Sequence, residues 1–249
     1  NTFRYILGNI NDVHEKISFE DLDIKSFNEL EQLMLFKIFK FNERFKHYFN
    51  EYNFHNLYKD LLNFCTTDLS AFYFDIRKDL LYCDSKDSKK RKDCIKVLNI
   101  ILDCLLKWFA PILSFTTEEI FMLIGKKNSS IHLEQFPKIP NNWNNQKLQK
   151  KWEKIEEIRN ICNFSIESKR SEKTIGSSLE AKVKIKLNKN DFNLVKDIDF
   201  SEVCITSLFE LEISNNNKIE VEADKAEGKK CALCWKIKTD KCSRSNCPI

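Results

Sequence analysis

Four cysteines near the end of the chain form the strongest chemical pattern in the sequence. They are Cys231, Cys234, Cys242 and Cys247, in the order C-x2-C-x7-C-x4-C. Thiolates bind tetrahedral Zn²⁺ well, and two cysteines separated by a short turn can supply two of its ligands. Because four sulfurs would leave no position open for a catalytic water, the pattern predicts one structural zinc ion per chain. Such an ion would fold a segment too short to have its own core.

A thiol-redox role is the alternative for Cys231 and Cys234, which have the C-x-x-C spacing of disulfide-exchange sites. The ten cysteines of the chain could also cluster here by chance. The sequence shows no signal peptide, so we expect a reducing compartment in which the remaining six cysteines are buried hydrophobic residues. These six are Cys65, Cys83, Cys94, Cys104, Cys162 and Cys204.

Basic residues and one tryptophan surround the first cysteine pair. Trp235 directly follows Cys234, where a tight turn around a metal is expected to leave it exposed. An exposed aromatic ring can stack on a nucleobase while nearby cations contact phosphates. The candidate RNA-contacting residues are Trp235, Lys229, Lys230, Lys236 and Arg244. Trp235 could equally pack inward and dock the segment, and the sequence leaves both roles open.

The charge of the chain is unevenly distributed. Residues 225–249 hold seven of the 41 Lys and Arg residues but only two of the 37 acids, a net charge of +5. Residues 1–224 therefore carry 34 basic and 35 acidic residues. A basic tail on a near-neutral body suggests a local contact with a polyanion. A second basic run, SKDSKKRK (85–92), could follow an RNA backbone or form a solvated helix end.

The elements that must position these residues are mainly helices. Apolar residues recur at helical spacing through residues 1–173, and 42% of the chain is hydrophobic while Gly and Pro number four each. We expect Ser26 to cap a first long helix, a helix from Asn53 to Cys65, and a new helix capped by Asp68 or Ser70. A helix over 91–109, apolar on more than one face, is expected to be central. Thr116 is the expected cap of a shorter helix ending at Gly125.

The pattern changes near residue 173. Residues 181–187 alternate between apolar residues and lysine, which predicts a half-buried strand. Two further strands are expected around the turn at 215–217. The predicted fold is mainly α: a helical domain over 1–173 with an extended connection at about 126–147, an α+β unit over 174–224, and a cysteine module over 225–249. Because the chain lacks an apolar run of roughly 18 residues, we expect no membrane span and a cytoplasmic protein.

Several stretches resemble one family, the bacterial-type isoleucyl-tRNA synthetases. The resemblance covers the chain in the expected order and rests on six segments: NTFRYILGNIND (1–12), NFCTTDLSAFYFDIRKDLLYCD (63–84), WFAPILSFTTEEIF (108–121), IHLEQFP (131–137), IGSSLEA (175–181) and KCALCWK (230–236). The last two discriminate best, because they occur together mainly in this family.

The resemblance implies a helical anticodon-binding domain followed by a zinc module, which together hold the anticodon stem and loop of isoleucine-accepting tRNA. The family attaches isoleucine to its tRNA with ATP, using H-x-G-H and K-M-S-K-S elements and an editing domain. None of these occurs here, so no catalytic residue is assigned, and ATP would bind only in a catalytic domain outside this sequence. The chain resembles a fragment or one part of a split enzyme, with the catalytic domain as its partner and a monomeric state expected.

Two departures from the family pattern concern the cysteine module. Leu233 stands where the family usually has a basic or polar residue, and the second pair is C-x4-C after seven residues instead of C-x2-C after a longer spacer. The resemblance therefore supports Cys231 and Cys234 as ligands more strongly than Cys242 and Cys247. A stand-alone RNA-binding or regulatory zinc protein derived from a synthetase is the alternative function. The valine family is disfavoured, because its terminal coiled coil has no heptad counterpart in 225–249.

Overall fold

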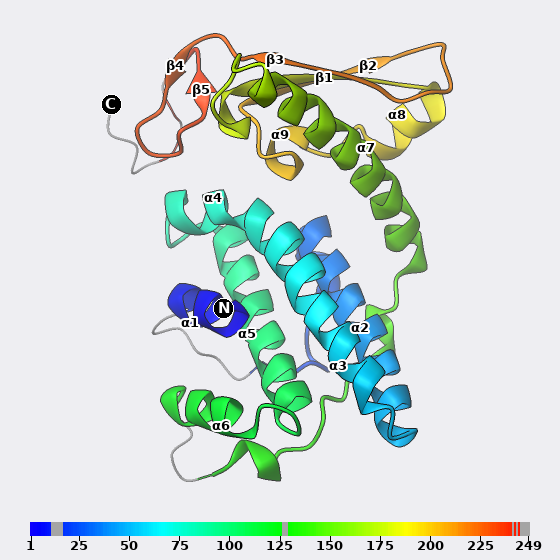
Figure 1. The fold of residues 1–249 in the computed structure, drawn as a ribbon, viewed down its shortest axis with the longest axis vertical. Coiled ribbons are helices and arrows are strands. Elements are labelled where there is room, and N and C mark those ends of the chain that lie inside the picture. The colour runs from blue at the N-terminus through cyan, green and yellow to red at the C-terminus, as the bar shows by residue number, and fades with distance from the viewer. Residues whose placement is uncertain (11–16, 126–128, 241, 243, 245–249) are drawn as a thin grey trace. The chain divides into compact units, whose positions relative to one another are not determined.

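The computed structural model describes residues 1–10, 17–125, 129–240, 242 and 244, and its chain divides into two compact units (Figure 1). The first unit comprises Asn1–Arg77 and Lys86–Asn145, and the second comprises Lys78–Ser85 and Gln146–Ile249. A helical first unit and an α+β second unit confirm the predicted fold class.

The first unit is a helical bundle built around α5 (Lys89–Phe109), which packs against α1 (Thr2–Ile10), α2 (Glu29–Asn50) and α6 (Ser114–Leu123) (Figure 1). Residues on every side of α5 are buried, so its predicted central place is confirmed. The remaining elements are α3 (Phe54–Asn63), the π-helix η2 (Phe64–Phe74), the 3₁₀ turns η1 (Ile24–Ser26), η3 (Ile131–Leu133) and η4 (Asn141–Trp143), and the start of α4 (Asp75–Cys83). From Lys78 onward α4 belongs to the second unit.

Aromatic residues fill the centre of this bundle. Trp108 is fully buried, and its indole N–H donates to the side-chain oxygen of Asn42 over 3.3 Å. The rings of Phe41, Phe45 and Phe64 lie 4.6, 6.0 and 6.1 Å from the Trp108 ring, centroid to centroid. Each such burial stabilises the fold by about 1.5–3 kcal/mol.

A buried ion pair also lies in the bundle. Glu31 on α2 is 0% exposed and Arg77 is 1% exposed. The guanidinium donates two hydrogen bonds of 2.6 Å to the two carboxylate oxygens, and the Tyr73 hydroxyl donates a third over 3.3 Å. Charge and hydrogen bonding are thus satisfied inside an apolar core, which is the condition for burying two ions.

The predicted helix break before Phe72 is wrong. The chain remains helical from α3 through η2 into α4, and the residues expected to cap a new helix have other partners. Asp68 accepts a 2.8 Å hydrogen bond from Lys37, while the Ser70 hydroxyl donates to the carbonyl of Cys65, five residues earlier. Because η2 buries Phe64, Leu69 and Phe72 against the bundle, packing overrides the local capping signal.

Two other predicted caps are wrong. Ser26 lies in η1, where its hydroxyl donates to the Asp23 carbonyl over 2.7 Å, and α2 begins after Asn28. The extended conformation of Phe27 lets its buried ring enter the core before the helix starts. Thr116 lies inside α6, which begins at Ser114. In both cases the residue expected to cap the helix lies within one helical turn of the residue at which the helix begins.

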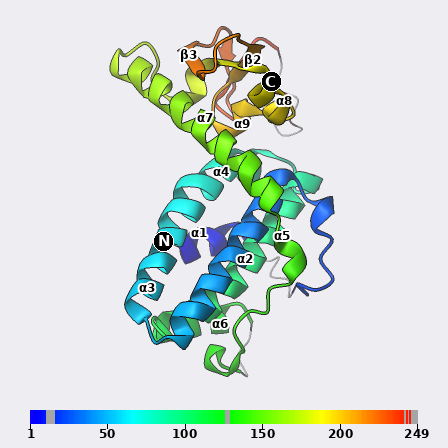
Figure 2. The same ribbon diagram turned by 90° about the vertical axis from the view of Figure 1, so that its right-hand side faces the viewer.

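The second unit contains a three-stranded sheet covered on one face by α7 (Gln146–Ser171) (Figures 1 and 2). Its strand order is β2 (Leu208–Ile213), β1 (Ala181–Leu187), β3 (Glu220–Lys225); β1 is parallel to β2 and antiparallel to β3. The turn η5 (Ser178–Glu180) precedes β1, and α8 (Lys189–Val195) and α9 (Phe200–Val203) form the crossover to β2. The two later strands are therefore present, but they do not pair with each other because β1 lies between them.

The alternation predicted for β1 is confirmed. Its four apolar side chains, Ala181, Val183, Ile185 and Leu187, are fully buried. Its three lysines form ion pairs with neighbouring strands: Lys182–Glu210 at 2.6 Å, Lys184–Glu212 at 2.9 Å and Lys186–Glu222 at 3.8 Å. Glu220 and Asp224 of β3 lie opposite Lys186 and Lys182, so acids outnumber lysines on this outer face of the sheet.

All six scattered cysteines are buried, as predicted. Among the described residues, no helix combines the length and the apolar character that crossing a bilayer requires.

Candidate metal centre and nucleic-acid interface

A short β-ribbon presents the first two cysteines. The strands β4 (Lys229–Lys230) and β5 (Ile237–Lys238) are antiparallel, and residues 231–236 between them form what we call the cysteine turn. The backbone N–H of Cys231 donates to the Lys236 carbonyl over 2.9 Å, and that of Trp235 donates to the Cys231 carbonyl over 3.0 Å. These bonds close a compact turn that points Cys231 and Cys234 to one place.

The Sγ atoms of Cys231, Cys234 and Cys242 all lie within 4.8 Å of one another. Two thiolates on one tetrahedral zinc would be about 3.8 Å apart, since each Zn–S bond is about 2.3 Å long. Cys234 is buried and the other two are half-buried. The three thiols therefore form a cluster that could hold a metal ion. Cys247, the fourth predicted ligand, lies outside the described residues.

Trp235 is held in an unusual conformation on the surface. Its side chain is 61% exposed, and its φ of 61° lies in the left-handed region that a bulky residue rarely adopts. The hydrogen bond from its N–H to Cys231 fixes this backbone. Strained residues of this kind persist where the surrounding structure demands them and occur frequently at ligand sites.

The four predicted cations differ in their surroundings. Lys229 and Lys230 are exposed, and Lys230 lies 3.5 Å from the carboxylate of Glu180. Lys236 is half-buried, and its ammonium donates to the Ser201 carbonyl over 3.4 Å. Arg244 is half-buried between two carboxylates. Lys229 and Lys230 thus precede the cysteine turn and Lys236 closes it, while Lys230 and Arg244 both have anionic partners.

The partners of Arg244 lie within α4 and just after it, in a stretch of chain that belongs to the same compact unit. Its two terminal nitrogens donate to the two oxygens of Asp79 over 2.8 and 2.5 Å, and its Nε lies 3.0 Å from Asp84. Burial raises the pKa of Asp79, but the hydrogen bonds and charge of Arg244 outweigh that effect and hold it below its ordinary value. Burial and the nearby Asp79 carboxylate raise the pKa of Cys83 to about 11.

Sequence reasoning did not identify Asp79, Cys83 and Asp84 as neighbours of the cysteine turn. The Cys83 thiol donates to the Leu233 carbonyl over 3.6 Å, although the two residues are 150 positions apart. Two acids at a helix end were the available signal, and nothing local connects them to a segment so distant in the sequence.

Gly228 is required where the ribbon begins. Its φ is +131°, and a Cβ there would collide with the carbonyl of Lys238 on β5. Gly228→Ala should destabilise the ribbon by about 1–3 kcal/mol, and amide hydrogen exchange across 229–239 should accelerate accordingly.

Gly8→Ala in α1 is the matched control for that substitution. An added Cβ there has nothing within 4 Å, so the helix should gain stability by roughly 0.5–1 kcal/mol. Unchanged exchange at 229–239 in Gly228→Ala would show that the ribbon tolerates the side chain.

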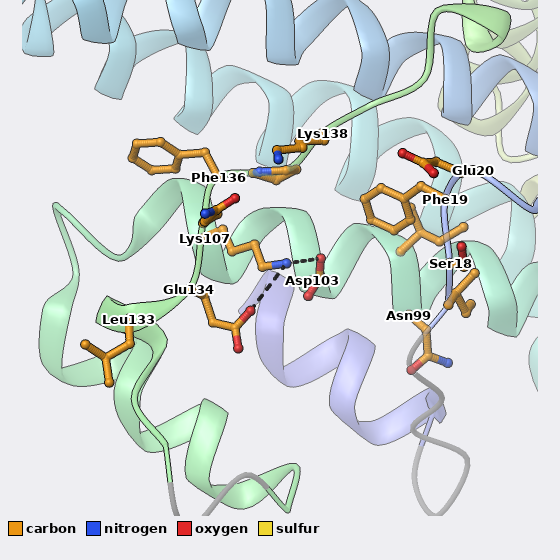
Figure 3. Close-up of a pocket in the computed structure, with 14 residues that line it drawn as sticks. Ser18, Phe19, Glu20, Asn99, Asp103, Lys107, Leu133, Glu134, Phe136 and Lys138 are labelled. Carbon is orange, nitrogen blue, oxygen red and sulfur yellow. Dashed lines mark hydrogen bonds and ion pairs between the residues drawn. The ribbon is translucent and has the colours of Figure 1, made fainter.

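A separate pocket lies in the bundle, where the segment 17–20 and the segment 133–138 face α5 (Figure 3). Its volume is about 480 Å³. Lys107 points into it and pairs with Asp103 at 2.7 Å and with Glu134 at 4.0 Å. Because these charged side chains already pair with one another, we place the candidate functional site at the cysteine turn.

Comparison with known proteins gives one consistent family. The model of the anticodon-binding domain of tRNA ligase matches residues 31–185. Isoleucine–tRNA ligase of Pelagibacter ubique is 60% identical over 244 residues, which is 98% of this chain and 27% of that protein. The Agrobacterium fabrum enzyme is 38% identical over 96% of this chain and 26% of its own length.

The chain spans about a quarter of the length of these curated relatives. Its similarity nevertheless extends over nearly all of its own residues, including the cysteine turn that the family model does not reach. The resemblance first seen in the sequence motifs is confirmed. The chain belongs to the family of anticodon-binding domains of tRNA ligases, and over almost its whole length it is similar to isoleucine–tRNA ligases.

Proposed function

We propose that this chain is the tRNA-binding part of an isoleucine–tRNA ligase. It holds the anticodon stem and loop of isoleucine-accepting tRNA while a catalytic domain of the same enzyme attaches isoleucine with ATP. The 60% identity to an isoleucine–tRNA ligase across 98% of the chain is the observation that carries this proposal. From this role in protein synthesis we infer a cytoplasmic location, and the monomeric state stays a prediction.

We infer that the cysteine turn binds one Zn²⁺ through Cys231, Cys234 and Cys242, with Cys247 as the fourth ligand expected from the sequence. Three thiols within 4.8 Å of one another support this choice of metal, because a soft, sulfur-only donor set suits zinc. When bound, the ion supplies a rigid cross-link rather than chemistry on a substrate. The protein's own hydrogen bonds from Cys231 and Trp235 then hold the aromatic ring outward.

The proposed RNA contact combines stacking with phosphate binding. Trp235 offers an exposed side chain, and Lys229, Lys230 and Lys236 lie within six residues of it in the sequence. Each lysine that neutralises a phosphate releases counterions, so the logarithm of the affinity should fall by about 0.7–0.9 per decade of salt for each contact. Shape and charge would therefore dominate affinity, while base stacking would add to it.

Trp235→Ala tests this interface. If the ring stacks on an anticodon base, the substitution should weaken binding of an isoleucine tRNA transcript by about 1–3 kcal/mol, roughly fivefold to 150-fold. Fluorescence titration at one fixed salt concentration measures the change.

Trp235→Phe is the control, because a smaller ring keeps most of the stacking. An unchanged affinity in Trp235→Ala would assign the ring to packing. If the unmodified chain fails to prefer isoleucine tRNA over other transcripts at low salt, the proposed function itself is refuted.

A further inference from the structure

The side chain of Arg244 is matched to the end of α4 by geometry and by charge. The two terminal nitrogens of its guanidinium donate to the two carboxylate oxygens of Asp79 over 2.8 and 2.5 Å. Its third nitrogen, Nε, lies 3.0 Å from the carboxylate of Asp84. The three side chains are between 22% and 25% exposed, so water screens them only in part. Bidentate pairs of this kind are stronger and more directional than ordinary ion pairs.

A second contact joins the same two segments. The Cys83 thiol donates to the carbonyl of Leu233, which lies inside the cysteine turn. The positive charge of Lys236 also acts on Asp79. Residues 79–84 therefore contact the module at two places: at Leu233, between Cys231 and Cys234, and at Arg244, two residues after Cys242.

These contacts argue against a phosphate-binding role for Arg244. One guanidinium between two carboxylates forms a group with net charge −1, so the charge of Arg244 is already compensated before a phosphate could approach. To reach RNA, the side chain would have to give up its bidentate contact with Asp79 and its contact with Asp84. The sequence alone predicts an RNA contact here, whereas the contacts observed for Arg244 are with two carboxylates of its own unit.

We propose that Arg244 is a positioning residue, which anchors the cysteine turn on the end of α4 through Asp79 and Asp84. The anchor sets the orientation in which Trp235 and the lysines near it in the sequence meet their ligand. The identification of that ligand as tRNA rests on the proposed function. The anchoring itself can be measured without RNA.

Two single variants of the full chain separate the roles: Arg244→Gln and Asp79→Asn. An anchor predicts that both variants loosen the turn: Asp79→Asn breaks the pair with Asp79, and Arg244→Gln breaks both that pair and the contact with Asp84. Both should then accelerate amide exchange at residues 231–238 about threefold to tenfold, with the bundle amides as internal reference. Both should also weaken tRNA binding, Arg244→Gln at least as much as Asp79→Asn, with the salt slope unchanged.

A direct phosphate contact predicts the opposite pattern. Arg244→Gln would then lower the salt slope by about 0.7–0.9. Asp79→Asn would strengthen binding, since it removes a negative charge beside the RNA. That pattern, together with unchanged exchange at 231–238, would overturn the proposal.

Lys184→Gln is the matched control, because it breaks an ion pair of 2.9 Å with Glu212 in the same unit but distant in sequence from the turn. It should leave exchange at 231–238 unchanged. The double variant Arg244→Asp with Asp79→Arg should recover part of the lost protection. If the unmodified chain does not bind tRNA, the proposed function fails while the exchange experiment still decides the anchor.

Discussion

Replacing Cys234 by serine is expected to unfold the segment 229–242 and to leave the helical bundle folded. Among the described residues of this segment, only Cys234 and Ile237 are buried, so it has almost no core of its own. Structural zinc sites in short peptides contribute apparent binding energies of about 10–16 kcal/mol at neutral pH. A serine hydroxyl is a poor substitute for a thiolate ligand, so the metal and the fold of the turn should be lost together.

Metal analysis of the reduced protein and amide exchange measure these two effects. The unmodified chain should contain one zinc per molecule, and Cys234→Ser should contain almost none and exchange rapidly at 229–239. Chelation of the unmodified chain should give the same exchange pattern. Cys204→Ala, which removes a buried thiol elsewhere in the second unit, is the control and should retain its zinc.

The alternative thiol-redox role of Cys231 and Cys234 predicts a different result for the same samples. If Cys231 and Cys234 exchange a disulfide, the reduced protein would lack stoichiometric zinc, and the pair would be oxidised by a dithiol-specific reagent. That result would refute the zinc site.

Glu31→Ala should lower the free energy of unfolding of the bundle by about 3–5 kcal/mol, because it leaves the guanidinium of Arg77 buried without its carboxylate. The loss is large for a domain, whose total stability is commonly about 5–15 kcal/mol. Replacing both partners by apolar residues, Glu31→Leu with Arg77→Met, should cost much less, since no unpaired charge remains.

Denaturant unfolding monitored through the bundle measures this difference. Asp60→Ala, which breaks the more exposed Arg44–Asp60 pair of 3.2 Å, is the control and should cost about 1 kcal/mol or less. A similar small loss in Glu31→Ala would mean that water reaches Arg77 and that its burial is not maintained in solution.

Local patterns in the sequence predicted the elements whose periodicity is uninterrupted. The alternation of β1 and the apolar faces of α5 both follow from burial, which depends on spacing along the chain. The cysteine spacing likewise predicted the cluster of Cys231, Cys234 and Cys242, because a tight turn brings such residues together whatever the rest of the fold does.

What could not be predicted depends on contacts that are distant in sequence. The π-helix at Phe64–Phe74 replaces an expected break because the bundle buries its apolar residues. The pairing of Arg244 with Asp79 spans 165 positions, and no periodicity encodes it. The position of β1 between β2 and β3 also could not be predicted, because strand order depends on how distant segments pair and not on the pattern within each strand.

The predicted domain boundary near residue 173 follows the change in secondary structure at the end of α7. The compact units instead divide between Asn145 and Gln146, because α7 packs on the sheet of the second unit, and that unit also includes Lys78–Ser85. The three-domain organisation predicted from the sequence therefore stays a proposal.

The outer face of the sheet has a consequence for RNA selectivity. Three lysines of β1 lie among five acids, Glu210, Glu212, Glu220, Glu222 and Asp224, so this surface repels a polyanion despite its lysine-rich strand. We therefore expect a nucleic acid that approaches this face to be repelled rather than bound. The number of lysines along a strand is thus a poor guide to where nucleic acid binds, since cross-strand neighbours decide the sign of the field.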